Sequence, residues 1–265
     1  MKTHGDTPRR KCPVCGSTPI EPLWAIPFST VQDPVLISGA NTWDLVLLDP
    51  EATVYCYSIC PRCQSIFQNP CFVGYKLKAK IAEAPQGLPS NTAAYRENFD
   101  RWMLPWFLPE YSVLLDAACG VAEYTRIAQG LSQWSTLLAT DISVPHVQRA
   151  RKLLPGVEAW SMDLDDEEFR PEIPKADFIV FAEAAEHVLR PAHVLHKLAN
   201  QLNPGGRIYW SIQSVDGRLP VRPRECIYAS RQGVTEILNA AGLKELLCEL
   251  DVGRFRIVAE RPPKD

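Results

Sequence analysis

Apolar stretches and helix-like stretches alternate along the second half of the chain, and this alternation constrains the fold more than any other feature. The apolar runs are SVLLDA, STLLAT, ADFIVFA and GRIYWSIQ, with a shorter run, VEAW. Between them lie segments with helical spacing: YTRIAQGL, PHVQRARKLL, AHVLHKLANQL and RQGVTEILNAAG. Continuous apolar runs are typical of parallel strands that are covered on both faces. We therefore expect an α/β fold with helices on both faces of a mostly parallel sheet.

The two ends of the chain differ from this pattern. The C-terminal run LKELLCEL, a DVG turn and RFRIVAERP predict an antiparallel hairpin. The first 90 residues are rich in proline and cysteine, and EAPQGLPSN (83–91) has the composition of a linker. A helix is expected in TAAYRENFDRWMLPWF, ending near Pro105. We therefore divide the chain into a small cysteine-rich β domain, residues 1–90, and an α/β domain, residues 91–265.

Two CxxC turns dominate the first domain. Cys12 and Cys15 form one, Cys60 and Cys63 form the other, and 44 residues separate them. Paired CxxC turns are typical of a tetrahedral four-thiolate zinc site, which is closed and therefore structural. Gly16 suits the tight turn after the first pair. The sequence predicts one structural zinc ion and a zinc-ribbon-like domain.

Other interpretations of the cysteines are less favoured. Cys56 and Cys71 lie near the second turn and could replace one of its ligands. The turns could instead carry buried thiols without a metal. A redox role is disfavoured because neither turn opens a βαβ unit.

We expect a nucleotide-type loop after the first apolar run of the α/β half. Residues 116–122, DAACGVA, match the pattern D-x-G-x-G-x-G except at Ala118 and Ala122. Farther along come Asp141 in LLATDIS, Asp163 in EAWSMDLDD, the E-x-x-E-H piece of FAEAAEHVLRP, and NPGG at 203–206. Taken in this order, the elements resemble those of class I S-adenosylmethionine-dependent methyltransferases over residues 112–259. The resemblance implies a seven-stranded Rossmann-like sheet with an antiparallel last strand.

The resemblance also implies a cofactor, S-adenosylmethionine, and residues that bind it. Asp141 would accept the ribose hydroxyls, Asp163 the adenine amino group, and Leu164 would cover the adenine ring. The full set of implied cofactor-binding residues is Asp116, Ala118, Cys119, Gly120, Asp141, Ile142, Asp163, Leu164 and Glu183. A dehydrogenase, the nearest rival, needs G-x-G-x-x-G, which Ala118, Gly120 and Glu123 do not match.

The two alanines bear on whether this loop works. Alanine is tolerated where φ is negative and is costly where φ is positive or where a ligand passes close. Because Gly120, Asp141 and Asp163 are retained, we expect a functional loop with weaker affinity. The alternative is a non-catalytic zinc-binding scaffold with a degenerate cofactor loop.

Methyl transfer requires a positioned acceptor and, for a hydroxyl acceptor, a base. His187 follows the fourth expected strand and is the candidate base. Arg218, Arg222 and Arg224 follow the fifth strand and could bind a phosphate or carboxylate. The cysteine domain, with FQNP after its second turn, resembles that of enzymes that methylate sugars or nucleotide-linked sugars. Those enzymes that methylate carbon carry a Glu-His pair after the fifth strand, where this chain has ECIYA. O- or N-methylation of a small molecule is therefore expected.

Charge and composition limit the classes of binding partner that we expect. Residues 1–90 carry 8 Lys and Arg against 7 Asp and Glu, and the net charge of the chain is -3. Such a balance disfavours nucleic acid, although a zinc-ribbon methyltransferase of rRNA or tRNA remains an alternative. The N-terminus has no apolar stretch typical of a secretory signal, and no run is long enough to span a membrane. We expect a cytoplasmic enzyme; its oligomeric state does not follow from the sequence.

Overall fold

The computed structural model describes residues 11–27, 54–69, 92–216 and 225–263. Several residues singled out in the sequence lie outside these ranges: the linker 83–91, Cys71, Arg218, Arg222 and Arg224. Among the described helices, none is both long and apolar enough to cross a membrane.

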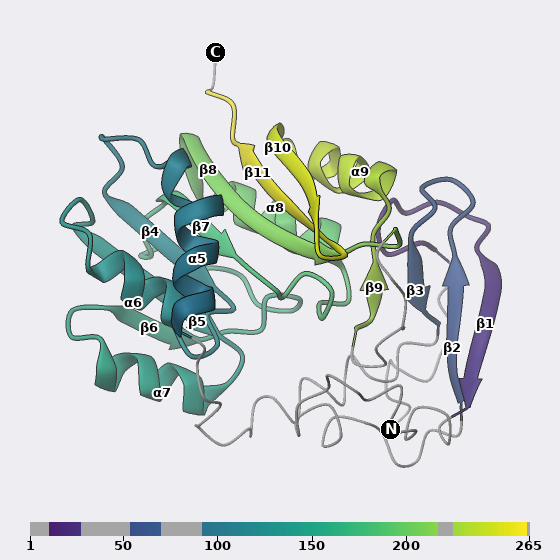
Figure 1. Ribbon diagram of the computed structural model, residues 1–265, viewed down its shortest axis with the longest axis horizontal. Helices are drawn as coiled ribbons and strands as arrows, with labels where there is room; N and C mark the ends of the chain where they lie inside the picture. The colour runs from purple at the N-terminus through teal and green to yellow at the C-terminus, as the bar shows by residue number, and fades with distance from the viewer. Residues whose placement is uncertain (1–10, 28–53, 70–91, 217–224, 264–265) are drawn as a thin grey trace.

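A seven-stranded sheet forms the centre of the α/β half (Figure 1), in the order β10-β11-β8-β7-β4-β5-β6. Strands β4 to β8 run parallel, β11 pairs antiparallel with β8, and β10 pairs antiparallel with β11. Both the seven-stranded sheet and the antiparallel last strand are confirmed. The strands are β4 Val113–Ala117, β5 Thr136–Asp141, β6 Glu158–Ser161, β7 Ala176–Phe181, β8 Leu202–Gln213, β10 Lys244–Asp251 and β11 Arg254–Glu260.

Helices cover both faces of this sheet, as the apolar runs predict. Successive side chains of a strand point to opposite faces, so Leu114 packs into one core and Leu115 into the other. One face carries α5 (Thr92–Trp102), α6 (Glu123–Gln129) and α7 (Val144–Leu153), with a 3₁₀ turn at Leu104–Trp106. The other face carries α8 (Pro191–Gln201) and α9 (Arg231–Ala241).

A second, four-stranded sheet combines both halves of the chain. Its order is β1-β2-β3-β9, and every pairing is antiparallel. Strands β1 (Glu21–Pro27), β2 (Val54–Ile59) and β3 (Ile66–Gln68) come from the N-terminal half. Strand β9 (Ile227–Tyr228) comes from the α/β half and stands beside β3 in Figure 1. Nothing in the sequence pattern indicated this shared strand.

Helix α9 packs tightly on the cysteine-rich module through its first turn. The Ser230 hydroxyl caps the helix by accepting a hydrogen bond from the Gly233 N–H at 2.9 Å, and it donates to the Cys63 carbonyl. Ser230 N–H donates to Ser65 Oγ at 3.3 Å. A Cβ atom at position 233 would lie 2.2 Å from Ser65 Oγ and 3.2 Å from Val14 Cγ1. Glycine at 233 therefore allows the close approach of the helix to the module.

Replacing Gly233 by alanine should destabilise the protein by about 1–3 kcal/mol, because overpacking outweighs the gain in helix propensity. The exposed neighbour Gln232 provides the control, since Gln232→Ala adds no atom to the contact and should change stability by less than about 0.5 kcal/mol. Denaturant unfolding of both variants measures this. A Gly233→Ala variant more stable than wild type would contradict the packing.

Candidate functional site

The loop between β4 and α6 adopts an unusual backbone conformation. Ala118, Gly120 and Ala122 have φ values of 57°, 53° and 59°, so every second residue is left-handed. A left-handed conformation costs a non-glycine residue roughly 1–2 kcal/mol. Both alanines therefore occupy the costly conformation, not the tolerated one with negative φ.

Contacts around the alanines hold the loop in this conformation. Ala122 is fully buried, its N–H donates to the Cys119 carbonyl at 2.8 Å, and its carbonyl accepts from the Arg126 N–H at 2.9 Å. Cys119 is also buried, and its N–H donates to the Thr140 carbonyl on β5 at 2.9 Å. The loop thus keeps the backbone path that three glycines would give, with stored strain that the surrounding hydrogen bonds sustain.

Asp116, at the end of β4, is buried and faces the start of α6. One carboxylate oxygen accepts hydrogen bonds from the Thr125 N–H at 3.2 Å and the Thr125 hydroxyl at 2.7 Å. Burial raises the pKa of Asp116 to about 7, although the Thr125 bonds oppose the shift, and the nearby Asp141 carboxylate adds to it. Asp116 therefore ties strand to helix beneath the loop.

Asp141, at the end of β5, joins the loop to the next helix. One of its oxygens accepts from the Gly120 N–H at 2.8 Å, and the other accepts from the Ser143 N–H at 2.8 Å. A carboxylate offers about four lone-pair positions, so further acceptor capacity is left for two hydroxyl groups. His146 Nδ1 lies 3.6 Å from Asp141 Oδ1. Nothing in the sequence pattern indicated His146, which lies in the first turn of α7.

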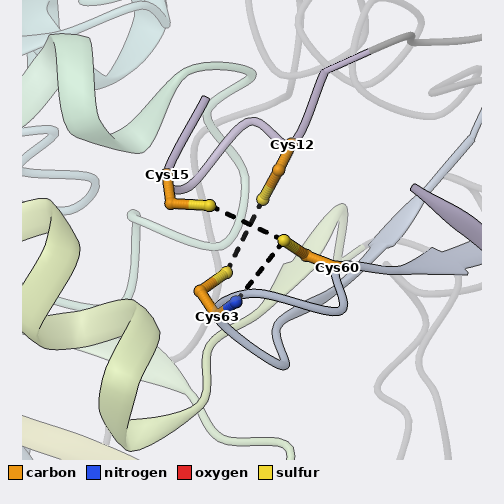
Figure 2. A group of neighbouring side chains, drawn as sticks. All are labelled: Cys12, Cys15, Cys60 and Cys63. Carbon is orange, nitrogen blue, oxygen red and sulfur yellow. Dashed lines mark hydrogen bonds between the residues drawn. The ribbon is translucent and has the colours of Figure 1, made fainter. Parts of the chain in front are cut away.

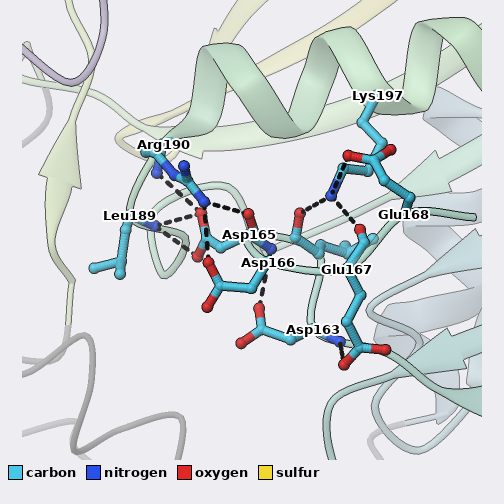
Figure 3. A network of polar contacts seen from close by, with 9 residues as sticks. Asp163, Asp165, Asp166, Glu167, Glu168, Leu189, Arg190 and Lys197 are labelled. Carbon is cyan, nitrogen blue, oxygen red and sulfur yellow. Dashed lines mark hydrogen bonds and ion pairs between the residues drawn. The ribbon is translucent and has the colours of Figure 1, made fainter.

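Asp163 begins an acidic stretch after β6 (Figure 3). Its Oδ1 accepts from the Asp165 N–H at 2.9 Å, which turns the chain back toward α8. Asp165, fully buried, accepts from the Leu189 N–H at 2.9 Å and the Arg190 N–H at 3.1 Å at the start of that helix. Lys197, from the same helix, donates to the Leu164 carbonyl at 3.0 Å. These contacts anchor the stretch and leave Asp163 half-buried beside the end of β6.

The remaining residues implied for the cofactor lie at the same edge of the sheet. Ile142 is half-buried next to Asp141, whereas Leu164 is buried in the core on the α8 side. Glu183 follows β7 with a φ of 55°, and its N–H donates to Ser211 Oγ at 2.9 Å. Because β4, β5, β6 and β7 are parallel, all these side chains stand at the carboxyl ends of the strands, where ligands bind in open α/β sheets.

His187 lies in the turn after β7 and is half-buried. Its neighbour Glu186 is fully buried and forms an ion pair with Arg254 of β11 at 2.6 Å. Burial alone would raise the pKa of Glu186, but the Arg254 guanidinium and the His187 ring overcome this and hold the pKa below its ordinary value. Nothing in the sequence pattern indicated Arg254, whose pairing with Glu186 joins β11 to the turn after β7.

The four cysteines of the CxxC turns come together in one cluster (Figure 2). Their sulfur atoms all lie within 4.8 Å of one another, with Cys12–Cys63 at 3.7 Å and Cys15–Cys60 at 3.6 Å. Four thiolates around zinc at about 2.3 Å are about 3.8 Å apart in a tetrahedron, so the spacing fits one ion. Cys56 does not belong to this cluster.

The two turns have the same backbone form. Gly16 follows the first pair with a φ of 73°, which fits the expected role of glycine there, and Gln64 follows the second pair with a φ of 59°. The Gly16 N–H donates to the Cys12 carbonyl at 2.9 Å, and the Gln64 N–H donates to the Cys60 carbonyl at 2.8 Å. Backbone N–H groups of Val14 and Cys63 also point at the sulfurs of Cys12 and Cys60, at 3.4 and 3.5 Å. Such donors stabilise thiolates, the form that binds a metal.

Comparison with known proteins identifies the α/β half. A family model described as a methyltransferase domain matches residues 88–250. A structure of a methyltransferase from Mesorhizobium loti that depends on S-adenosylmethionine is 18% identical, with a TM-score of 0.52, and the match covers 66% of this chain and all of that one. A search of curated proteins gave no match.

Two other solved structures share the fold but belong to differently described proteins. One is a putative methyltransferase in complex with the activator Trm112 of Haloferax volcanii, at 17% identity and a TM-score of 0.51, covering 66% of this chain and 95% of that one. The other is the cyclase SpnF, at 15% identity and a TM-score of 0.52, covering 65% and 82%. At these identities the likeness concerns the fold alone.

The raised pKa of Asp116 predicts a pH dependence of stability. The unfolded chain loses this proton near the ordinary pKa of 3.8, whereas the folded protein keeps it until about pH 7. The contribution of Asp116 to the free energy of unfolding is therefore complete below pH 3.8. It falls as the pH rises from 3.8 to about 7, by up to about 1.4 kcal/mol per pH unit. The Asp116→Asn variant, which cannot titrate at this position, should show a flatter profile in thermal unfolding from about pH 4 to about pH 7. Equal slopes in variant and wild type would contradict the shift.

Proposed function

This chain belongs to the family of methyltransferase domains, and we propose that its acceptor is a small molecule of the sugar or nucleotide-linked sugar kind. The methyl donor is S-adenosylmethionine, which supplies a methyl group on a sulfonium. The donor assignment rests on the row of acids at the ends of β4, β5 and β6, joined to the left-handed loop by the Gly120–Asp141 bond. The acceptor class rests on the four-cysteine cluster that precedes the transferase, which resembles that of enzymes that methylate sugars.

In the proposal, four groups of residues at this edge of the sheet surround the donor. The loop residues Asp116, Ala118, Cys119 and Gly120 face its amino acid end, near the N-terminus of α6. Asp141 and Ile142 hold the ribose; Asp163 and Leu164 hold the adenine ring; Glu183 closes the site beside β7. The spare lone pairs of Asp141 and the half-buried position of Asp163 support this assignment.

His187 is the proposed base. Because displacement at the methyl carbon needs an aligned acceptor, positioning contributes most, and proton removal matters when the acceptor is a hydroxyl. The position of His187 in the turn after β7, at the same sheet edge as Asp141, supports this role. Arg218, Arg222 and Arg224 are proposed to bind a phosphate or carboxylate group of the acceptor.

The cysteine cluster is the proposed site of one structural zinc ion. Four sulfur ligands leave no open position, so the ion orders the module and takes no part in the chemistry. In this division, residues 1–90 supply the metal module and residues 91–265 the transferase, which lends β9 to the smaller sheet.

Asp141→Ala should weaken binding of S-adenosylhomocysteine by about 100-fold, because charged hydrogen bonds to the ribose are lost. Asp177→Ala is a matched control. Asp177 accepts from the N–H groups of Ser112 and Val113, at 2.9 and 3.0 Å, at the opposite end of the sheet. Calorimetry should find reduced stability but ordinary affinity in the control. Normal affinity in Asp141→Ala would remove the site assignment.

Cys60→Ser should lose zinc and lower the stability of the N-terminal module, since a structural ion contributes its binding energy to folding. Cys56→Ser, on β2 outside the cluster, should keep one zinc per chain. Elemental analysis of both purified variants and their thermal unfolding provide the test. A Cys60→Ser variant with unchanged metal content would show that the cluster does not hold it.

The acceptor is tested with radiolabelled S-adenosylmethionine and three pools: nucleotide-linked sugars, other hydroxyl and amine compounds, and ribosomal RNA at low salt. We expect label in the sugar pool, and a decrease of at least about 100-fold with His187→Gln if a hydroxyl is methylated. Label in RNA alone would replace the proposal with the zinc-ribbon RNA methyltransferase. No label in any pool, together with no affinity for the donor, would favour the alternative of a non-catalytic zinc-binding scaffold.

A further inference from the structure

The segment from Glu225 to Ser230 connects two distant parts of the molecule. It contains β9, and all six residues are buried. On one side, Ile227 and Tyr228 pair with Phe67 and Ile66 of β3 in the cysteine-rich module. On the other side, Ala229 bridges to Ser214 at the end of β8. The segment is therefore a member of the small sheet and a neighbour of the large one.

The cysteine cluster contacts this segment through a few hydrogen bonds. Cys63 belongs to the cluster, and its carbonyl accepts the hydrogen bond of the Ser230 hydroxyl. Ser65, two residues on, has a fully buried side chain whose oxygen accepts from the Ser230 N–H. Gln68 N–H donates to the Cys226 carbonyl at 2.9 Å. The second CxxC turn and the strand after it thus contact both ends of the segment.

The same segment holds the turn that carries His187. The Cys226 N–H donates to the Glu186 carbonyl at 2.8 Å, so Cys226 bonds to the module through its carbonyl and to the turn through its N–H. Glu225, also buried, accepts from Gln213 Nε2 at 3.1 Å. Burial would lower the pKa of the largely buried Arg254 guanidinium, but the Glu186, Glu183 and Glu225 carboxylates overcome this and raise it.

We propose that the four-cysteine module is a positioning element for the Glu186–His187 turn, acting through the segment 225–230. Metal binding closes the two CxxC turns and thereby orders β3, which in turn orders its partner strand β9. The Cys226 N–H then holds the Glu186 carbonyl of the turn, and Glu225 acts on Arg254, the ion-pair partner of Glu186. His187 is placed as a result of this chain of contacts, and the metal contributes no chemistry of its own. The inference rests on the proposed role of His187, which sits on the positioned turn.

Hydrogen exchange, read by mass spectrometry on the full chain, tests the coupling without any acceptor. Zinc-loaded and chelator-treated proteins are compared. Removing the metal should speed exchange about tenfold in peptides that cover 54–68, 225–230 and 183–190. Peptides from the loop 113–125 should keep their protection, and calorimetric affinity for S-adenosylhomocysteine should stay within about twofold.

Two variants test the path in zinc-loaded protein. Ser230→Ala removes the bond to Cys63 together with the cap of α9, and should speed exchange at 183–190. Arg62→Ala breaks the exposed ion pair between the second turn and Glu236 of α9, at 3.0 Å, and should leave that peptide unchanged. Equal exchange at 183–190 with and without metal, while 54–68 is released, would overturn the proposal. Loss of protection throughout the chain would overturn it too, since the metal would then act on the whole fold.

The outcome separates this inference from the proposed function. If no form binds S-adenosylhomocysteine but the exchange at 183–190 still follows the metal, the cofactor assignment fails and the coupling stands. If binding is normal but the exchange at 183–190 ignores the metal, the coupling fails and the cofactor assignment stands.

Discussion

The proposed site depends on the two hydrogen bonds that the Asp141 carboxylate accepts. With one oxygen on the Gly120 N–H and the other on the Ser143 N–H, it ties the loop after β4 to the turn after β5. These bonds help to offset roughly 1–2 kcal/mol of strain at each of the two alanines in left-handed positions. Backbone hydrogen bonds at Cys119 and Ala122 share that load. Hydrogen bonds to neighbouring residues therefore hold the two alanines at positive φ, a conformation that glycine would adopt without steric cost.

The structure also joins two units that the sequence separates. The cysteine cluster, β3 and the segment 225–230 form one continuous buried path to the turn after β7. In the proposed function this path would connect the four-cysteine cluster to the turn that carries His187, the proposed base. The proposed zinc ion would then do more than hold its own module together.

Much of the fold follows from the sequence because its signals are local. Strands buried on both faces read as continuous apolar runs, and CxxC turns carry their own geometry, so the sheet and the cysteine cluster were predictable. The two-residue strand β9 was not, since its pairing comes from tertiary contact and not from its own pattern. The left-handed φ of Ala118 and Ala122 was not predictable either, because alanine ordinarily avoids it. The Glu186–Arg254 pair and the place of His146 beside Asp141 depend on which strand ends become neighbours.

The proposed function requires that the loop with its two alanines still forms a working donor site. Calorimetric titration of the zinc-loaded wild-type protein with S-adenosylmethionine and with S-adenosylhomocysteine measures this. We expect saturable binding of both, in the micromolar range, with thermal stabilisation by excess ligand. No heat and no stabilisation at millimolar ligand would contradict it, and would mean that the alanines have closed the site.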